Sequence, residues 1–160
     1  MHKGHNQVNM DFETNKLLAE NHMGVVTSED YVRWAVACLE SGLDSKNIRI
    51  LASLQKPLYT PDVDFYFRRC LKDLGWTMPE RRECLLNYVR HFARQILSGD
   101  LSPDDGGTKI YRIAVALNYP QELMAWVYLH ADLEPTTFKE LQGAEWDEAI
   151  KDEAANLARL

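Results

Sequence analysis

"TPDVDFYFRRCLKDLG", residues 60–75, indicates the fold class of this chain more directly than any other stretch. Thr60 and Pro61 are typical of a helix cap followed by the first helical residue, and Gly75 is typical of the position after a helix end. Apolar side chains between them recur at the spacing i, i+3, i+4, i+7, i+8 and i+11, which places them on one helical face. These residues are Val63, Tyr66, Phe67, Cys70, Leu71 and Leu74. The stretch therefore predicts an amphipathic α-helix over residues 61–74.

The same kind of pattern continues on both sides of this helix. It predicts helices over 12–22, 28–41, 45–54, 79–98, 108–118 and 120–131, and a last one beyond Pro135, in one or two pieces around Gly143. Only residues 24–27 resemble a strand, and one short fragment cannot form a sheet. We therefore expect an all-α fold of about eight helices, with a disordered tail at 1–10 and a single domain at 11–160.

The chain repeats one order of elements after two Ser-Gly pairs that lie 57 residues apart, Ser41-Gly42 and Ser98-Gly99. Each pair is followed by a loop, a short helix, a proline and a longer helix. The pattern predicts two stacked three-helix units, an α-α superhelix in which each unit buries a face that it cannot bury alone. The alternative is that no repeat exists, since helix-ending glycines and prolines recur in any all-α protein.

Composition and charge bound the classes of partner. The chain has 160 residues, of which 46% are hydrophobic and 26% charged, as is ordinary for a globular protein. No apolar run is long enough for a membrane span, and the N-terminus lacks the apolar core of a signal peptide, so we expect a cytoplasmic protein without a membrane partner. The net charge of −6 argues against nucleic acid, whose phosphates need Lys and Arg, and fits a basic protein partner.

Three cysteines lie at wide spacing inside helical patterns: Cys38, Cys70 and Cys84. Each has Leu or Ala beside it, and the sequence contains no Cys-x-x-Cys motif. We therefore expect buried, reduced thiols rather than disulfides, metal ligands or catalytic nucleophiles.

The five histidines follow no pattern of a metal site. Two lie in the N-terminal tail, and His22, His91 and His130 lie on three different predicted helices, without the spacing of zinc ligands. We predict no metal, no cofactor and no catalytic residue. The alternative is an enzyme with a helical pocket in which His91 or His130 meets Glu, Asp or Cys.

The loop "SGDLSPDDGGTK", residues 98–109, combines three aspartates with a pair of glycines. It lacks the alternating oxygen ligands and final Glu of a calcium loop, and the Gly-x-x-x-x-Gly-Lys order of a phosphate-binding loop. We interpret it as a helix start, with a turn at Pro103, glycines in unusual backbone angles, and Asp105 or Thr108 near the helix N-terminus.

Two arginines, Arg49 and Arg112, occupy matching places in "IRIL" and "YRIA". A pair of guanidiniums at matching places would bind an anion if the two units brought them together. The alternative, which we favour, is local ion pairs with acidic neighbours such as Asp44 or Asp105.

Exposed aromatic side chains beside acidic residues form the predicted partner-binding surface. Four aromatic residues fall in loops or on polar helix faces, where they suit the role of interface anchors, and four aspartates supply a charged rim. The aromatic residues are Tyr59, Phe65, Trp76 and Tyr119, and the aspartates are Asp62, Asp64, Asp104 and Asp105. The alternative is that the aromatic rings fold back over the edge of the core.

Three stretches resemble a group of small uncharacterised bacterial proteins: "EDYVRWAVACLESGLDSKNIRILASL", "YFRRCLKDLGW" and "ILSGDLSPDDGGTKIYRIA". The shared features are a short helix ending Ile-Leu-Ala-x-Leu, a Tyr-Phe helix ending Leu-Gly, and a Gly-x-Leu/Ile-x-Pro loop. The similarity spans roughly residues 28–130. It implies a small acidic all-α protein, similar in character to immunity proteins that neutralise toxins, and it implies no particular activity.

These observations leave three hypotheses for function. The first is a protein-binding module, an immunity-type or regulatory protein, whose acidic surface neutralises a basic partner. The second is the enzyme with a histidine-containing pocket. The third is a structural homodimer that buries the exposed aromatic residues in its own interface.

Overall fold

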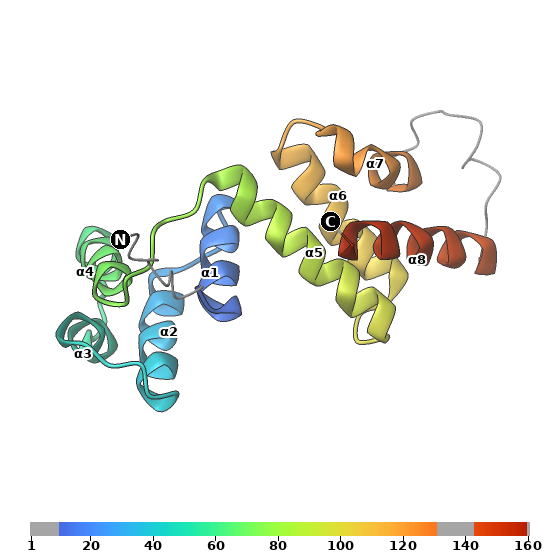
Figure 1. Cartoon of the computed structure of the whole chain (residues 1–160). Coiled ribbons are helices and arrows are strands. Elements are labelled where there is room, and N and C mark those ends of the chain that lie inside the picture. Colours follow the sequence, from blue (N-terminus) through green and yellow to red (C-terminus); the bar gives the residue numbers. More distant parts are fainter. Residues whose placement is uncertain (1–9, 131–142, 160) are drawn as a thin grey trace, which may run out of the picture. The chain divides into compact units, whose positions relative to one another are not determined.

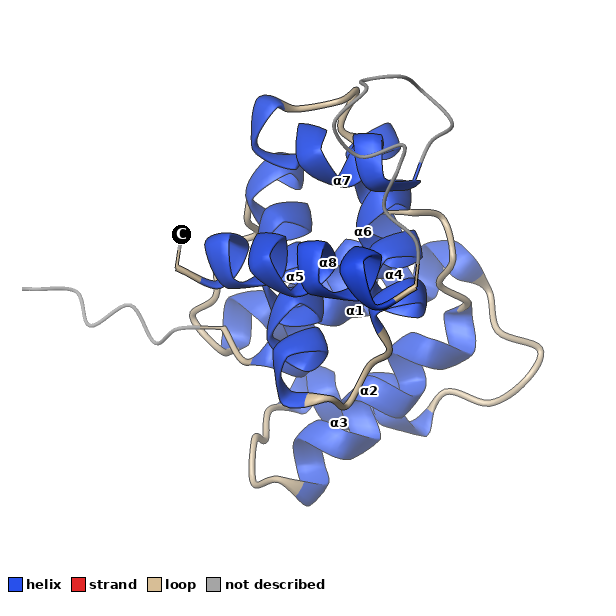
Figure 2. Cartoon of the chain, turned by 90° about the vertical axis from the view of Figure 1, so that its right-hand side faces the viewer, coloured by secondary structure: helices blue, strands red, loops and turns tan. Residues whose placement is uncertain are grey.

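The computed structural model describes residues 10–130 and 143–159, and within these ranges it contains helices and no strand (Figures 1 and 2). The helices are α1 (Phe12–His22), α2 (Ser28–Glu40), α3 (Lys46–Ser53), α4 (Thr60–Asp73), α5 (Arg81–Ser98), α6 (Pro103–Ala116), the 3₁₀ helix η1 (Gln121–Leu123), α7 (Met124–His130) and α8 (Ala144–Ala158). The predicted all-α fold is therefore confirmed. Most of the predicted N-terminal tail and the segment around Pro135 lie outside the described residues.

The chain divides into two compact units after Arg81. Unit 1, residues 1–81, holds α1 to α4, and unit 2, residues 82–160, holds α5 to α8. The first set of predicted repeat helices thus falls in unit 1 and the second set in unit 2. The superhelical stacking of the two sets and the single domain over 11–160 stay predictions.

Aromatic packing joins the helices of unit 1. Phe67 of α4 contacts two rings of α2 edge-on, with centroid distances of 4.8 Å to Tyr31 and 5.0 Å to Trp34. The indole N–H of Trp34 donates to the hydroxyl of Thr14 on α1, at 2.8 Å and out of contact with solvent. One polar pair therefore fixes α1 to α2 while leaving no unsatisfied donor at Trp34.

The end of α4 turns the chain back onto the helix. Gly75 adopts a left-handed φ of +70°, and the N–H of Trp76 donates to the carbonyl oxygen of Leu71 at 2.9 Å, six residues counted inclusively. This is the Schellman arrangement of a helix C-terminus, in which glycine carries the left-handed angle without strain. It directs Trp76 against α4 instead of into solvent.

In unit 2, α6 begins five residues earlier than the sequence pattern predicted. Ser102 is the cap, since its hydroxyl accepts the N–H of Asp105 at 3.1 Å, and Pro103 is the first helical residue. The interpretation of the glycine pair as a loop is therefore wrong: Gly106 and Gly107 are helical and buried.

Both glycines of α6 allow close contact between helices. A Cβ atom on Gly106 would overlap the side chain of Ile96 on α5, and one on Gly107 would overlap the imidazole of His130 on α7. Interiors are packed too densely to accept such atoms without displacing a neighbour. The glycine pair therefore permits α6 to lie against α5 and α7.

Candidate functional site

The eight residues of the predicted surface are divided between the two units. Tyr59, Asp62, Asp64, Phe65 and Trp76 belong to unit 1, and Asp104, Asp105 and Tyr119 belong to unit 2. Within unit 2, the two aspartates lie in the first turn of α6 and Tyr119 lies beyond its last turn. At a rise of about 1.5 Å per residue, the helix places about 20 Å between them. The structure therefore does not bring the unit 2 residues into one patch.

The strongest cluster of predicted residues lies at the start of α4. Here α4 begins beside the start of α2: the hydroxyl groups of Ser28 and Thr60 lie 3.2 Å apart, and Lys56 forms an ion pair with Glu29 at 3.3 Å. These contacts hold the segment that leads into α4. Both contacts flank Tyr59, the residue before the helix, whose side chain is 65% exposed.

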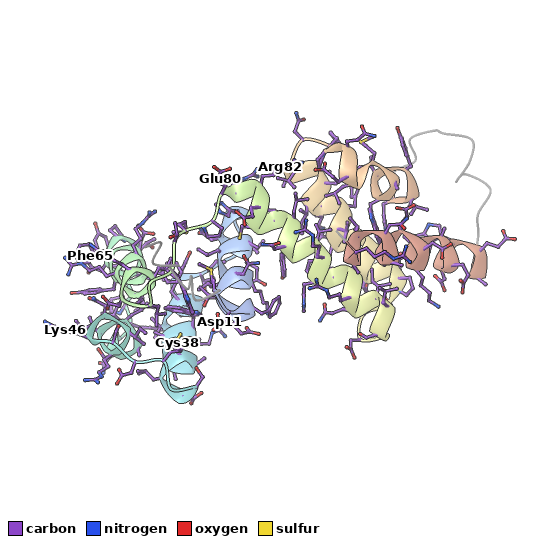
Figure 3. The ribbon with its side chains drawn as sticks, in the orientation of Figure 1. Asp11, Cys38, Lys46, Phe65, Glu80 and Arg82 are labelled. Carbon is purple, nitrogen blue, oxygen red and sulfur yellow. The ribbon has the colours of Figure 1, made fainter. Side chains whose placement is uncertain are left out.

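Phe65, labelled in Figure 3, is an exposed aromatic residue on α4, and two neighbouring side chains contact its ring. The side chain is 50% exposed. The guanidinium of Arg69 lies 4.5 Å from the ring centroid, a cation–π contact, and the ring of Tyr66 meets Phe65 edge-on at 5.2 Å. Phe65 therefore combines exposure to solvent with two contacts to its ring.

We call Tyr59, Asp62, Phe65 and Arg69 the α4 face. The last three recur at i, i+3 and i+7, so they share one side of the helix. Among the described residues, the carboxylate of Asp62 has no ion-pair partner. Asp64 lies beside this stripe and is already engaged, since it accepts a hydrogen bond from Arg68 at 2.8 Å. The α4 face thus presents two aromatic rings, one cation and one carboxylate without an ion pair.

The expectation that Trp76 is exposed is wrong, whereas its assignment to the partner-binding residues stays a prediction. Its side chain is only 8% exposed, because the turn at Gly75 folds it back onto the end of α4. Its indole N–H is buried and has no acceptor among the described residues. Sequence position alone, next to a helix-ending glycine, did not distinguish a solvated tryptophan from one that covers the core.

Asp104 and Asp105, at the start of α6, take part in the helix N-terminus. Ser102 caps the helix by accepting the Asp105 N–H, and its hydroxyl donates to the Asp105 carboxylate at 2.9 Å, which orients the cap. Asp104 and Asp105 both lie in the first turn, where the helix dipole favours negative charge. Their position is thus explained by helix formation.

Tyr119 lies in a strained turn after α6. Its side chain is 45% exposed, and its φ is +57°, directly after Asn118 at +58°. Its N–H donates to the carbonyl of Ala114 at 2.8 Å, which closes the helix end. Asparagine tolerates the left-handed region, whereas a bulky side chain rarely adopts it. Sequence analysis selected Tyr119 for its aromatic ring and missed its backbone.

His130 lies among aromatic rings. Tyr111 stacks near it at 6.2 Å, Trp146 meets it edge-on at 5.5 Å, and its Nε2 is buried without a hydrogen-bond partner among the described residues. Burial lowers the pKa of His130, and the carboxylate of Asp104 partly opposes this shift.

The other predicted histidine, His91, is on α5, 6.4 Å from the ring of Tyr88. The residues that the structure describes contain no group of three or more His, Cys, Asp or Glu side chains suited to hold a metal ion. The enzyme hypothesis requires a histidine beside Glu, Asp or Cys in a pocket. His130 has aromatic ring neighbours, and the carboxylate of Asp104 acts on its charge, so this hypothesis stays a prediction.

The three cysteines are buried and free. Burial raises the pKa of Cys38 to about 11, of Cys70 to about 12 and of Cys84 to about 11. Thiols with such pKa values are protonated at neutral pH and react slowly, because the thiolate is the nucleophile.

Arg49 is engaged in a local ion pair, as favoured from the sequence. Its Nε and Nη2 atoms donate to the two carboxylate oxygens of Asp44 at 2.7 and 2.5 Å. This bidentate pair lies in unit 1, whereas Arg112 lies in unit 2. The pairing of Arg49 accounts for its charge without an external anion.

In the described ranges, every helix is too short or too polar to cross a membrane. Comparisons with protein-family models, with curated proteins and with solved structures find no match to this chain. The resemblance to small bacterial proteins therefore stays an expectation from the three sequence stretches.

Proposed function

We propose that this chain is a protein-binding module and that a basic protein partner docks on the α4 face. One observation carries the proposal: two aromatic side chains, Tyr59 and Phe65, are exposed near the start of α4 together with Asp62, where side-chain contacts join the chain to the start of α2. Exposed tyrosine and arginine are enriched among residues that dominate interface energies. An immunity-type or regulatory protein of the cytoplasm is the concrete form of this proposal.

The fixed ring of Phe65 supports a role as an anchor. Ordering a mobile side chain on binding costs about 0.5–1.5 kcal/mol, and a side chain already held by its neighbours avoids part of that cost. The contacts of Phe65 with Arg69 and Tyr66 provide such preorganisation. Burial of the two rings by a partner would then supply most of the apolar contact.

The distribution of charge favours a basic partner. Residues 1–81 contain 10 Lys and Arg against 11 Asp and Glu, whereas residues 82–160 contain 8 against 13. Net charges of −1 and −5 follow, so most of the acidity lies in unit 2. The electrostatic field of a negatively charged protein attracts basic proteins over a distance. We propose that the α4 face then determines which of them binds.

The test is a capture experiment with matched variants, followed by a binding measurement on the purified partner. The baits are the unaltered chain, the double variant Tyr59→Ala/Phe65→Ala, and Phe12→Ala, which removes an exposed aromatic ring from α1 of the same unit. We expect one basic partner with the first and third baits only. Calorimetry should give a Kd raised about 30-fold for Phe65→Ala, the effect of a loss of about 2 kcal/mol at a hot spot.

Other outcomes would contradict the proposal. Equal capture by the double variant would place binding outside the α4 face. A native mass of twice the chain, reverting to a monomer in Tyr59→Ala/Phe65→Ala, would instead support the homodimer hypothesis. A Kd that does not rise with salt would exclude electrostatic attraction as part of the mechanism.

A further inference from the structure

A hollow of about 450 Å³ lies at the end of α4, and unit 1 forms it alone. We call it the α4-end hollow. Its apolar lining comes from Leu71 and Trp76, which are buried, and from Met78, which is exposed. Its volume falls within the range of small-ligand sites, about 300–1,000 Å³. Gly75 also lines it, and the space above that residue is open.

The charged residues of the α4-end hollow are both cations, although the chain as a whole is acidic. Arg68 and Lys72 lie four residues apart and therefore on one side of α4. Arg68 shares its charge with Asp64. Lys72 has no ion-pair partner in the described part of the chain. The lining thus combines apolar surface with positive charge.

Two exposed backbone donors lie at the same place and are open to a ligand. The turn uses the N–H of Gly75 and of Trp76 to close the helix. The N–H groups of the next two residues, Thr77 and Met78, have no acceptor among the residues that the structure describes. Adjacent free N–H groups are a common means of holding a carboxylate, as in sites that capture the C-terminus of a peptide.

We propose that the α4-end hollow binds the free C-terminus of a peptide that ends in an apolar residue. The terminal carboxylate meets Lys72 and the N–H groups of Thr77 and Met78, and the last side chain covers Trp76. All of these groups come from residues 68–78, so carboxylate and apolar side chain must be close together, and a C-terminal residue carries both on one Cα. The site uses none of the four residues of the α4 face, so the two proposals stand independently.

Nuclear magnetic resonance of the ¹⁵N-labelled full chain tests this proposal with small probes. The probes are N-acetyl-leucine, which has a terminal carboxylate, and N-acetyl-leucinamide, which has the same side chain and no charge. We expect N-acetyl-leucine to shift the indole signal of Trp76, assigned from Trp76→Phe, and the amide signals of Thr77 and Met78. The amide probe should bind about tenfold more weakly, since it lacks the charge-assisted hydrogen bonds.

Matched lysine variants separate a specific contact from general attraction. Lys72→Gln should weaken the binding of N-acetyl-leucine about threefold, as expected for the loss of one exposed charge contact. It should leave the affinity for N-acetyl-leucinamide unchanged. Lys46→Gln removes an exposed lysine from α3 and should change neither affinity. Both positions are on the surface, so both variants should fold.

Four results would overturn the proposal. Equal binding of the acid and the amide would leave an apolar hollow without a carboxylate site. The absence of any change in these signals with either probe at tens of millimolar would show that the hollow does not bind them. An equal loss of affinity for N-acetyl-leucine in Lys46→Gln and Lys72→Gln would show that Lys72 makes no specific contact. Binding of the amidated dipeptide N-acetyl-Leu-Glu-amide as tightly as N-acetyl-leucine would show that an internal acidic side chain is recognised and not a C-terminus.

Discussion

At the scale of single residues, the backbone of Tyr119 is strained, although its side chain is not a buried part of the core. A left-handed angle costs an ordinary residue about 1–2 kcal/mol, and almost half of this side chain faces solvent. Strained positions persist where something other than stability maintains them, which makes Tyr119 a second place to look for a contact with a partner.

The strain gives a direct prediction for Tyr119→Gly. Glycine adopts the same backbone angle freely, so we expect the free energy of unfolding to rise by about 1 kcal/mol after the entropy of the more flexible unfolded chain is counted. Urea unfolding followed by circular dichroism measures it. Tyr59→Gly is the control, because φ at Tyr59 is −98° and no strain is relieved there. A less stable Tyr119→Gly would mean that packing of the ring outweighs the strain.

His130 should make stability depend on pH. Burial lowers the pKa of His130 in the folded chain below its ordinary value of about 6.5. As the pH falls below that value, the unfolded chain binds a proton that the folded chain does not, so stability is full above it and declines towards the lower folded pKa. We expect the free energy of unfolding to fall between pH 7.5 and 5.5, and to fall less in His130→Asn.

His22 contributes to the same pH dependence, since burial and the charge of Arg81 lower its pKa too. The variant His22→Asn therefore measures the effect in unit 1. An identical pH profile for His130→Asn and the unaltered chain would show that the imidazole of His130 reaches water in the folded state.

At the scale of elements, the start of α6 is the helix boundary that differs most between the sequence prediction and the structure. Ser102→Ala should destabilise the chain by about 1 kcal/mol, because it removes the hydroxyl that caps the helix. Thr108→Ala is the matched control. Sequence patterns placed the helix start near Thr108, whereas the structure places this residue inside the helix, with its hydroxyl donating to the carbonyl of Asp104. Thermal unfolding compares the two, and a larger loss in Thr108→Ala would contradict the observed start.

The clean apolar stripe of α4 could be predicted because burial on one face repeats at the helical period. The start of α6 could not be predicted, because a short stretch with two glycines and three aspartates has the composition of a loop. What makes the glycines helical is contact with Ile96 and His130, which lie on other helices and are not visible from the neighbouring sequence.

The candidate site divides in the same way. Phe65 could be predicted as exposed, because it stands on the polar side of a clear amphipathic pattern, and Tyr59 because it falls in the loop before the helix. Trp76 could not, because the turn at Gly75, and not the helical period, decides where its ring lies. The α4-end hollow has no signature in the sequence, since its donors are backbone groups.

At the scale of the whole molecule, the buried cysteines report on how the two units unfold. Cys38 and Cys70 belong to unit 1, and Cys84 belongs to unit 2. Their raised pKa values and burial predict that none reacts with a thiol reagent within minutes at pH 8 in the folded chain, and that all three react in denaturant.

Reaction of these thiols across a urea series tests the predicted single domain. A single cooperative domain exposes all three thiols in one transition that coincides with the loss of helix. Two transitions, one exposing two thiols and the other exposing one, would show that unit 1 and unit 2 unfold separately.

The glycine pair of α6 also bears on how relatives of this chain would be recognised. Most surface positions of a helix accept many residues, whereas Gly106 and Gly107 exclude every side chain unless Ile96 and His130 change with them. Together with the cap and first-turn proline, they form the pattern Ser-Pro-x-x-Gly-Gly at 102–107. Descendants of a common ancestor could diverge almost everywhere else and still retain these four residues at this spacing, which makes the pattern a useful addition to overall identity in a search for relatives.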